Sequence, residues 1–128
     1  MQQGLMHRDV KPGNIMLDAL HKMLVLVDFG LCRRFGLEEI CKEESVRCMT
    51  GIVGTYRFMA PEVFRKEHYD AKIDVYSGSM VVYVMLFGKM PFAEMSGEAV
   101  AKIVARVSLQ PDFFSCKNKD LARLLMQV

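Results

Sequence analysis

The chain has 128 residues, of which 52% are hydrophobic and 25% are charged, and its formal net charge is +2. This composition is ordinary for one globular unit, and the net charge is too small to indicate nucleic acid or a membrane surface as a partner. The longest uncharged run, Val75 to Gly88, is shorter than the ~20 residues that span a bilayer, so we expect neither a nucleic-acid nor a membrane partner.

The first predicted element is a small β-hairpin. The apolar runs "NIML" (residues 14–17) and "MLVLV" (residues 23–27) flank the polar stretch "DALHK", which suits a turn. From Leu31 to about Arg57 the sequence carries many charges and several glycines without sustained periodicity. We interpret this stretch as a long loop, and loops of this length in compact domains are usually functional or disordered.

The first predicted helix begins at Asp70 or Asp74 and runs to about Phe87. Gly88 and Pro91 follow it, and both residue types end helices. Gly78 lies in the middle of this helix, where a glycine costs about 1 kcal/mol relative to alanine. The pattern therefore predicts a long apolar helix with one unfavourable position.

A second helix is predicted over Ser96 to Arg106, and a third from Asn118 to Val128. Ser96 and Asn118 are of the residue types that cap a helix N-terminus through a side-chain oxygen. The fold class that these elements predict is α+β, mainly α, with small β-hairpin elements followed by helices. Apolar residues at helical spacing predict the buried faces of the two helices, namely Val100, Ile103, Val104 and Val107 in one and Leu121, Leu124, Leu125 and Val128 in the other.

The four cysteines show no spacing that is typical of a metal site or a redox motif. They are Cys32, Cys41, Cys48 and Cys116, and no two of them form a Cys-x-x-Cys pair. We interpret them as free thiols in a reducing compartment, and we expect a cytoplasmic protein.

Three short motifs follow one another along the chain: "HRDVKPGN" (residues 7–14), "DFG" (residues 28–30) and "APE" (residues 60–62). In this order and at these separations they resemble the motif set of the protein-kinase family. The stretches "GTYRFMAPEVF" and "DVYS" extend the resemblance. Lys11 and Thr55 resemble the serine/threonine class, and the first of these stretches is similar to the tyrosine-kinase-like group within it.

The resemblance implies transfer of the γ-phosphoryl group of ATP, with Mg²⁺, to Ser or Thr hydroxyls of a protein substrate. Asp9 would orient the substrate hydroxyl and accept its proton, and Lys11 would place a positive charge near the transferred group. Asn14 and Asp28 are oxygen ligands of the kind that Mg²⁺ prefers. Met16 would form part of the surface under the adenine ring.

Further residues have a structural or regulatory role in the resemblance. Thr55 would bridge to the catalytic Asp and Lys. Arg8 would pair with a phosphate that an upstream kinase places on Thr50 or Ser45, although an unmodified loop hydroxyl at Thr50 stays open. Asp74 would accept backbone N–H bonds from the segment around Arg8.

The resemblance covers essentially the whole chain, but only the second half of a kinase domain. It divides the chain into a catalytic loop (7–14), an activation segment (28–62) and a helical remainder (63–128), which together imply the C-terminal lobe of the kinase fold. No glycine-rich loop, phosphate-binding Lys or partner Glu fits into the six residues before His7, so we expect an absent N-terminal lobe and negligible kinase activity from this chain alone. A non-catalytic, pseudokinase-like protein-binding module is the alternative.

Overall fold

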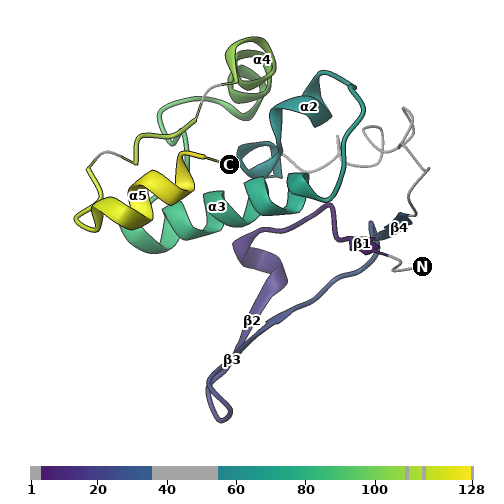
Figure 1. The fold of residues 1–128 in the computed structure, drawn as a ribbon, viewed down its shortest axis with the longest axis vertical. Coiled ribbons are helices and arrows are strands. Elements are labelled where there is room, and N and C mark those ends of the chain that lie inside the picture. The colour runs from purple at the N-terminus through teal and green to yellow at the C-terminus, as the bar shows by residue number, and fades with distance from the viewer. Residues whose placement is uncertain (1–3, 36–54, 109, 114, 128) are drawn as a thin grey trace.

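The computed structural model describes residues 4–35, 55–108, 110–113 and 115–127. Helices and two small sheets make up this part of the chain, which confirms the mixed, mainly helical class that the sequence predicts (Figure 1). The elements in chain order are β1 (Gly4–Met6), the 3₁₀ turn η1 (Pro12–Asn14), β2 (Ile15–Asp18), β3 (Met23–Leu26), β4 (Arg33–Phe35), the 3₁₀ turn η2 (Thr55–Phe58), α2 (Pro61–Phe64), α3 (Lys72–Phe87), α4 (Gly97–Val107) and α5 (Lys119–Leu125).

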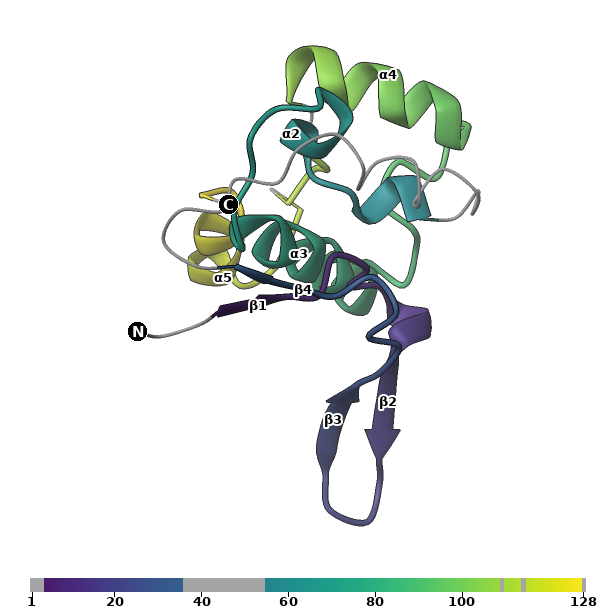
Figure 2. The ribbon, with the colours of Figure 1, turned by 90° about the vertical axis from the view of Figure 1, so that its right-hand side faces the viewer.

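The predicted hairpin is present. Strands β2 and β3 pair antiparallel, with Met16 opposite Val25. Its turn is closed by Asp18, whose Oδ1 atom accepts the backbone N–H groups of Leu20 at 3.1 Å and His21 at 3.2 Å. The hairpin projects away from the helices (Figure 2), so its shape depends on this local turn chemistry and on its own ladder.

The prediction of a long loop from Leu31 to Arg57 is wrong at the start of this stretch. Residues 33–35 form β4, which pairs antiparallel with β1, and Leu5 lies opposite Arg34. Three residues are too few to show the alternation by which a strand is predicted, and the partner strand is distant in the sequence. Residues 36–54 lie outside the described part of the chain.

Helix α3 is the central element of the fold (Figure 1). The helix begins at Lys72, midway between the two predicted starting points, and the Asp70 Oδ1 atom accepts the N–H group of Lys72 at 2.8 Å. The helix ends where predicted, at Gly88, whose backbone has a left-handed φ of 64° and donates to the carbonyl of Val84 at 2.9 Å. A Cβ atom placed on Gly78 would meet nothing within 4 Å, so this glycine faces open space.

Both predicted helix caps are confirmed. Ser96 accepts the N–H group of Ala99 at 3.2 Å at the start of α4, and Asn118 accepts that of Leu121 at 3.0 Å at the start of α5. Each side-chain oxygen satisfies one of the helix donors that have no partner within the helix.

The sequence predicts a wider buried face on α4 than the structure shows. Val100 and Val104 are each 1% exposed, but Ile103 is 38% and Val107 61% exposed. This helix packs against η2 and α2, and that contact covers a narrower strip than the apolar residues occupy.

The predicted buried face of α5 is also only partly buried. Leu125 is buried and Leu121 is half-buried, whereas Leu124 is exposed and Ala122 is buried in its place. The side chain of Val128 lies outside the described residues.

The core consists of two clusters on the two ends of α3. One joins η2 and α2 to the first half of the helix, and the other joins the second half to α5 and the segment before it. The members of the first cluster are Phe58, Met59, Ala60, Val63, Ile73, Tyr76, Met80 and Val81, and those of the second are Tyr83, Phe113, Cys116, Ala122 and Leu125.

None of the helices in the described ranges is long and apolar enough to cross a membrane.

Candidate functional site

The carboxylate of Asp9 lies at the centre of a compact polar cluster. Its Oδ2 atom accepts a hydrogen bond from the Lys11 Nζ at 2.5 Å and another from the Asn14 Nδ2 at 2.9 Å. Asn14 Nδ2 also donates to the backbone carbonyl of Asp9 at 2.8 Å. Because the pair is charge-assisted and only 7% of Asp9 is exposed, these contacts hold the carboxylate in one orientation.

The second oxygen of Asp9 is different. Oδ1 is buried and has no hydrogen-bond partner among the described residues. A buried acceptor without a donor is unfavourable by roughly 1–3 kcal/mol, and by more when it carries charge. A hydroxyl group that reached Oδ1 would remove this penalty, so the cluster is suited to bind and deprotonate an incoming hydroxyl.

The local sequence accounts for how these three residues meet. Pro12 begins the short turn η1, since its fixed φ suits the first position of a helical turn. The N–H group of Asn14 donates to the carbonyl of Lys11 at 3.0 Å, which closes the turn. Lys11 and Asn14, two and five residues after Asp9, thereby both reach its Oδ2 atom.

A residue on α3 fixes the backbone before Asp9. The carboxylate of Asp74 accepts the N–H group of His7 at 2.6 Å and that of Arg8 at 2.8 Å. Arg8 has a φ of 66°, in the left-handed region that non-glycine residues rarely adopt. This carboxylate therefore holds a strained turn in place, in the anchoring role that the sequence predicts for Asp74.

His7 links the first motif to the second. Its Nδ1 atom lies 3.3 Å from the N–H group of Asp9, and its Nε2 atom lies 3.1 Å from the carbonyl of Val27. A neutral ring with the proton on Nε2 satisfies both contacts. The ring of Phe29 packs edge-on against it, with 5.2 Å between the centroids. The segment that carries Asp28 is thus held beside the Asp9 cluster.

Two side-chain oxygens are suited to a hard cation. Asn14 uses its Nδ2 on Asp9, so its amide oxygen remains available. Asp28 is exposed, and its Oδ1 atom accepts a long hydrogen bond of 3.3 Å from the N–H group of Gly30. Amide and carboxylate oxygens are the donors that Mg²⁺ prefers, so these residue types fit that ion. Among the described residues, no group of three or more His, Cys, Asp or Glu side chains forms another metal site.

Met16 lies on an open apolar surface of the hairpin. It is 58% exposed, and its cross-strand neighbour Val25 is also exposed. Such a surface can receive the flat face of an aromatic ring. The role of Met16 under the adenine ring stays a prediction.

The regulatory and bridging residues are placed only in part. Arg8 donates from Nε to the carbonyl of Leu31 at 2.6 Å. Thr55 begins η2, and its side chain lies outside the described residues. Thr50 and Ser45 also lie outside them, so their pairing with Arg8 stays a prediction.

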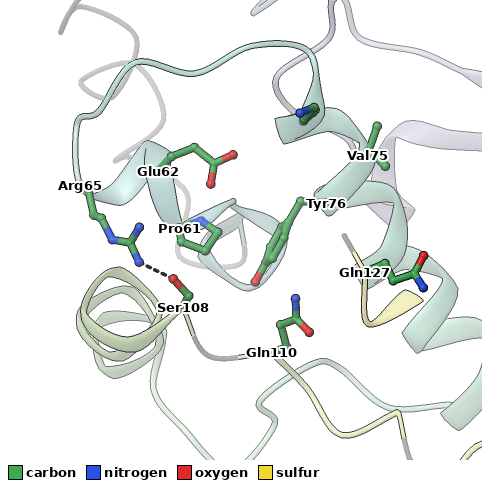
Figure 3. Close-up of a pocket in the computed structure, with 9 residues that line it drawn as sticks. Pro61, Glu62, Arg65, Val75, Tyr76, Ser108, Gln110 and Gln127 are labelled. Carbon is green, nitrogen blue, oxygen red and sulfur yellow. Dashed lines mark hydrogen bonds between the residues drawn. The ribbon is translucent and has the colours of Figure 1, made fainter. Parts of the chain in front are cut away.

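A cavity of about 490 Å³ lies away from the Asp9 cluster, between α2, α3 and the end of α4 (Figure 3). Sequence reasoning missed it, because its lining comes from distant segments that include Pro61, Tyr76 and Gln127. The Tyr76 hydroxyl is buried there without a hydrogen-bond partner among the described residues. Burial, together with the negative charge of Glu62, raises the pKa of Tyr76 to about 12.

Comparison with known proteins shows which protein family the chain is similar to. A family model described as "Protein kinase domain" matches residues 1–125. The chain is 42% identical to the serine/threonine-protein kinase VIK of Arabidopsis thaliana over 102 residues, which are 79% of this chain and 23% of that protein. It is 36% identical to the serine/threonine-protein kinase AtPK2/AtPK19 of the same organism over 126 residues, which are 98% of this chain and 25% of that protein.

A bacterial relative shows the same similarity. The chain is 40% identical to the serine/threonine-protein kinase PknB of Mycobacterium leprae (strain TN) over 100 residues, which are 78% of this chain and 15% of that protein. The chain thus spans a quarter or less of the length of these curated relatives.

Proposed function

Because this chain belongs to the protein-kinase family, we propose that it forms the C-terminal lobe of a serine/threonine kinase and takes part in transferring the γ-phosphoryl group of ATP to Ser or Thr hydroxyls of a protein. The observation that carries the proposal is the Asp9 cluster. It combines one carboxylate oxygen that is held by Lys11 and Asn14 with a second that has no partner in the described part of the chain. The tyrosine-kinase-like group remains our proposal from the sequence alone.

The roles follow from the charges and contacts. Asp9 accepts the proton of the acceptor hydroxyl on Oδ1 while Oδ2 stays on Lys11 and Asn14. The Lys11 ammonium lies 2.5 Å from that carboxylate, so the same cation holds the base in place and lowers the energy of negative charge that develops nearby. Thr55 would steady this pair from the side of η2.

The nucleotide belongs on the hairpin side of the cluster. Asn14 and Asp28 would hold Mg²⁺ through side-chain oxygens, and Met16 would lie under the base. Bound Mg²⁺ neutralises phosphate charge and aligns the transferred group. The anchoring of Phe29 on His7 keeps Asp28 close to the loop that carries Asn14.

The nucleotide surface in these residues is one-sided. Met16, Leu24, Val25 and Phe29 are all exposed, and the hairpin stands clear of the helices (Figure 2). Positioning and exclusion of water supply much of the rate in phosphoryl transfer. We therefore propose that a polypeptide of these 128 residues has negligible activity by itself, and that a second wall must cover this surface.

Control by phosphorylation is part of the proposal. Arg8 and the loop between Asp28 and Glu62 would respond to a phosphate that an upstream kinase places on Thr50 or Ser45. Its support is the motif order, because a basic residue directly precedes Asp9.

A non-catalytic protein-binding module is the second candidate. The observation that favours it is the apolar surface on α4, where Ile103 and Val107 are exposed one turn apart beside Lys102 and Arg106. Such a surface suits contact with another protein. The two candidates differ in whether replacing Asp9 matters.

The test is phosphoryl transfer from Mg²⁺-ATP to a Ser/Thr protein acceptor by the protein at its full natural length. We expect Asp9→Asn to lower the rate on the order of 10²- to 10⁴-fold. Asp18→Asn, which removes a carboxylate from the exposed hairpin turn, is the matched control and should leave the rate unchanged. If the wild-type protein transfers no phosphate, or if Asp9→Asn transfers it at the wild-type rate, the kinase proposal is wrong.

A further inference from the structure

Arg57 makes an unusual set of contacts on the side of η2 that faces the loop after α3. Its guanidinium group donates from Nη1 to the carbonyls of Pro91, at 2.9 Å, and Phe92, and from Nη2 to that of Met95 at 2.5 Å. Three backbone acceptors from one short loop therefore converge on a single side chain. The loop, residues 88–95, has no strand or helix of its own apart from turns.

The backbone of this loop is strained where Arg57 binds it. Phe92 has a φ of 53°, and a bulky residue in the left-handed region is an outlier that persists only when its surroundings fix it. Its carbonyl also accepts the N–H group of Met95 at 3.0 Å, which closes a turn around the guanidinium group. The loop is thus folded about Arg57.

The turn η2 is held from its other side as well. The Ser77 hydroxyl on α3 donates to the carbonyl of Phe58 at 2.7 Å, and both groups are buried. Arg57 and Ser77 therefore fix η2 between the loop and the central helix. Thr55, the first residue of η2, is the residue that the proposed function places on Asp9.

The positively charged guanidinium group of Arg57 binds the protein's own backbone. An arginine next to a substrate site would ordinarily be assigned to an acidic residue of the substrate. Here both terminal nitrogens donate to carbonyl oxygens of loop 88–95, so the charge is already used within the protein. The fixed fork of donors on a guanidinium group suits several acceptors at once better than the single ammonium group of lysine does.

We propose that Arg57 is a positioning residue for the acceptor protein, which holds loop 88–95 against η2 and so fixes the backbone of this turn, and that it does not select acidic acceptors. The inference rests on the proposed function. Asn14, Met16 and Asp28, the residues assigned to the nucleotide, lie on other elements, so the effect of Arg57 falls on the acceptor.

The experiment compares Arg57→Met, Arg57→Lys and the matched control Arg123→Met in the protein at its full natural length. Arg123 is an exposed arginine on α5, outside every site proposed above, so its replacement removes the same charge without touching the loop. Hydrogen exchange in residues 88–96 reports on the loop without any catalysis. Steady-state kinetics with one acidic and one neutral acceptor peptide report on the acceptor and on ATP separately.

We expect Arg57→Met to speed exchange in residues 88–96 by about 10-fold or more, with Arg57→Lys intermediate and Arg123→Met unchanged. The KM of both acceptor peptides should rise about 10-fold and equally, while the KM of ATP stays within about twofold.

Three results would overturn the inference: unchanged exchange in Arg57→Met, a parallel rise in the KM of ATP, or a selective loss of the acidic peptide. A wild-type protein that transfers no phosphate refutes the proposed function and with it the acceptor role, whereas the exchange result still decides whether Arg57 holds the loop.

Discussion

The carboxylate of Asp74 accepts the backbone N–H group of Arg8 at 2.8 Å, although 66 residues separate the two in the chain. Its other oxygen accepts the N–H group of His7 at 2.6 Å. The segment that leads to Asp9 is therefore fastened to the first turn of α3 by one side chain that binds two successive amides. This anchor is why a strained residue can precede Asp9 without the loop rearranging.

Replacing this anchor should destabilise the fold. Asp74→Asn keeps the size of the side chain but leaves it only one acceptor oxygen, so one of the two N–H groups loses its partner. We expect a loss of about 1–3 kcal/mol in the free energy of unfolding, measured by urea denaturation. Asp70→Asn is the control, because Asp70 binds a single exposed amide at the start of α3. Equal effects at the two positions would contradict the anchoring role.

Gly78 and Gly88 should respond to alanine in opposite directions. Gly78 lies inside α3 with nothing within 4 Å of an added Cβ atom, so Gly78→Ala should stabilise the chain by about 1 kcal/mol through helix propensity. Gly88 has a φ of 64°, where an L side chain is strained, so Gly88→Ala should destabilise it by about 1–2 kcal/mol. Thermal denaturation of both variants checks the pair, and a destabilising Gly78→Ala would show that the space beside α3 is filled.

The ionisation of Tyr76 predicts how stability depends on alkaline pH. Burial and the charge of Glu62 raise its pKa to about 12 from an ordinary value near 10. The folded state thus holds this proton more tightly than the unfolded state, so the stabilisation is complete below pH ~10 and is lost as the pH rises towards ~12.

We expect Tyr76→Phe to remove this share of the pH dependence, about 2–3 kcal/mol across that window. At neutral pH the variant should be as stable as the wild type or slightly more so, because the hydroxyl that it loses has no partner among the described residues. Denaturant unfolding at a series of pH values measures this. Tyr69→Phe, which removes the hydroxyl of a more exposed tyrosine, is measured beside it as the control.

Nucleotide binding should depend on covering the hairpin surface. Millimolar Mg²⁺-ATP should leave the melting temperature of the 128-residue polypeptide unchanged, because only one side of the nucleotide would be in contact. The protein at its full natural length should melt at a higher temperature with Mg²⁺-ATP, and Asp28→Asn should lose most of that increase. An increase in the 128-residue polypeptide would mean that this half of the site binds nucleotide unaided, contrary to our proposal.

Much of the local structure was predictable from the sequence. Ser96 and Asn118 were predicted as caps and act as caps, Gly88 ends α3, and the hairpin closes at its polar turn. In each case the deciding contact joins residues within a few positions of one another. The sequence therefore contains all the information that the contact needs, and backbone geometry alone connects the two partners.

The burial of helix faces was predicted less well. Ile103 and Leu124 have the spacing of core residues, yet both are exposed. Periodicity shows which residues share a side of a helix, but it does not show how much of that side a neighbouring element covers.

The motif residues define what the sequence by itself determined: the family, the closing of η1, and the meeting of Asp9 with Lys11 and Asn14, since all three lie within six positions. The anchoring of Arg8 by Asp74 was expected from the family resemblance, although the two residues are distant in the sequence. Only the tertiary structure decided the other contacts between distant segments, which are the pairing of β4 with β1 and the binding of loop 88–95 by Arg57. The physical reason is that such contacts depend on how packed elements are placed in space, which no short window of residues specifies.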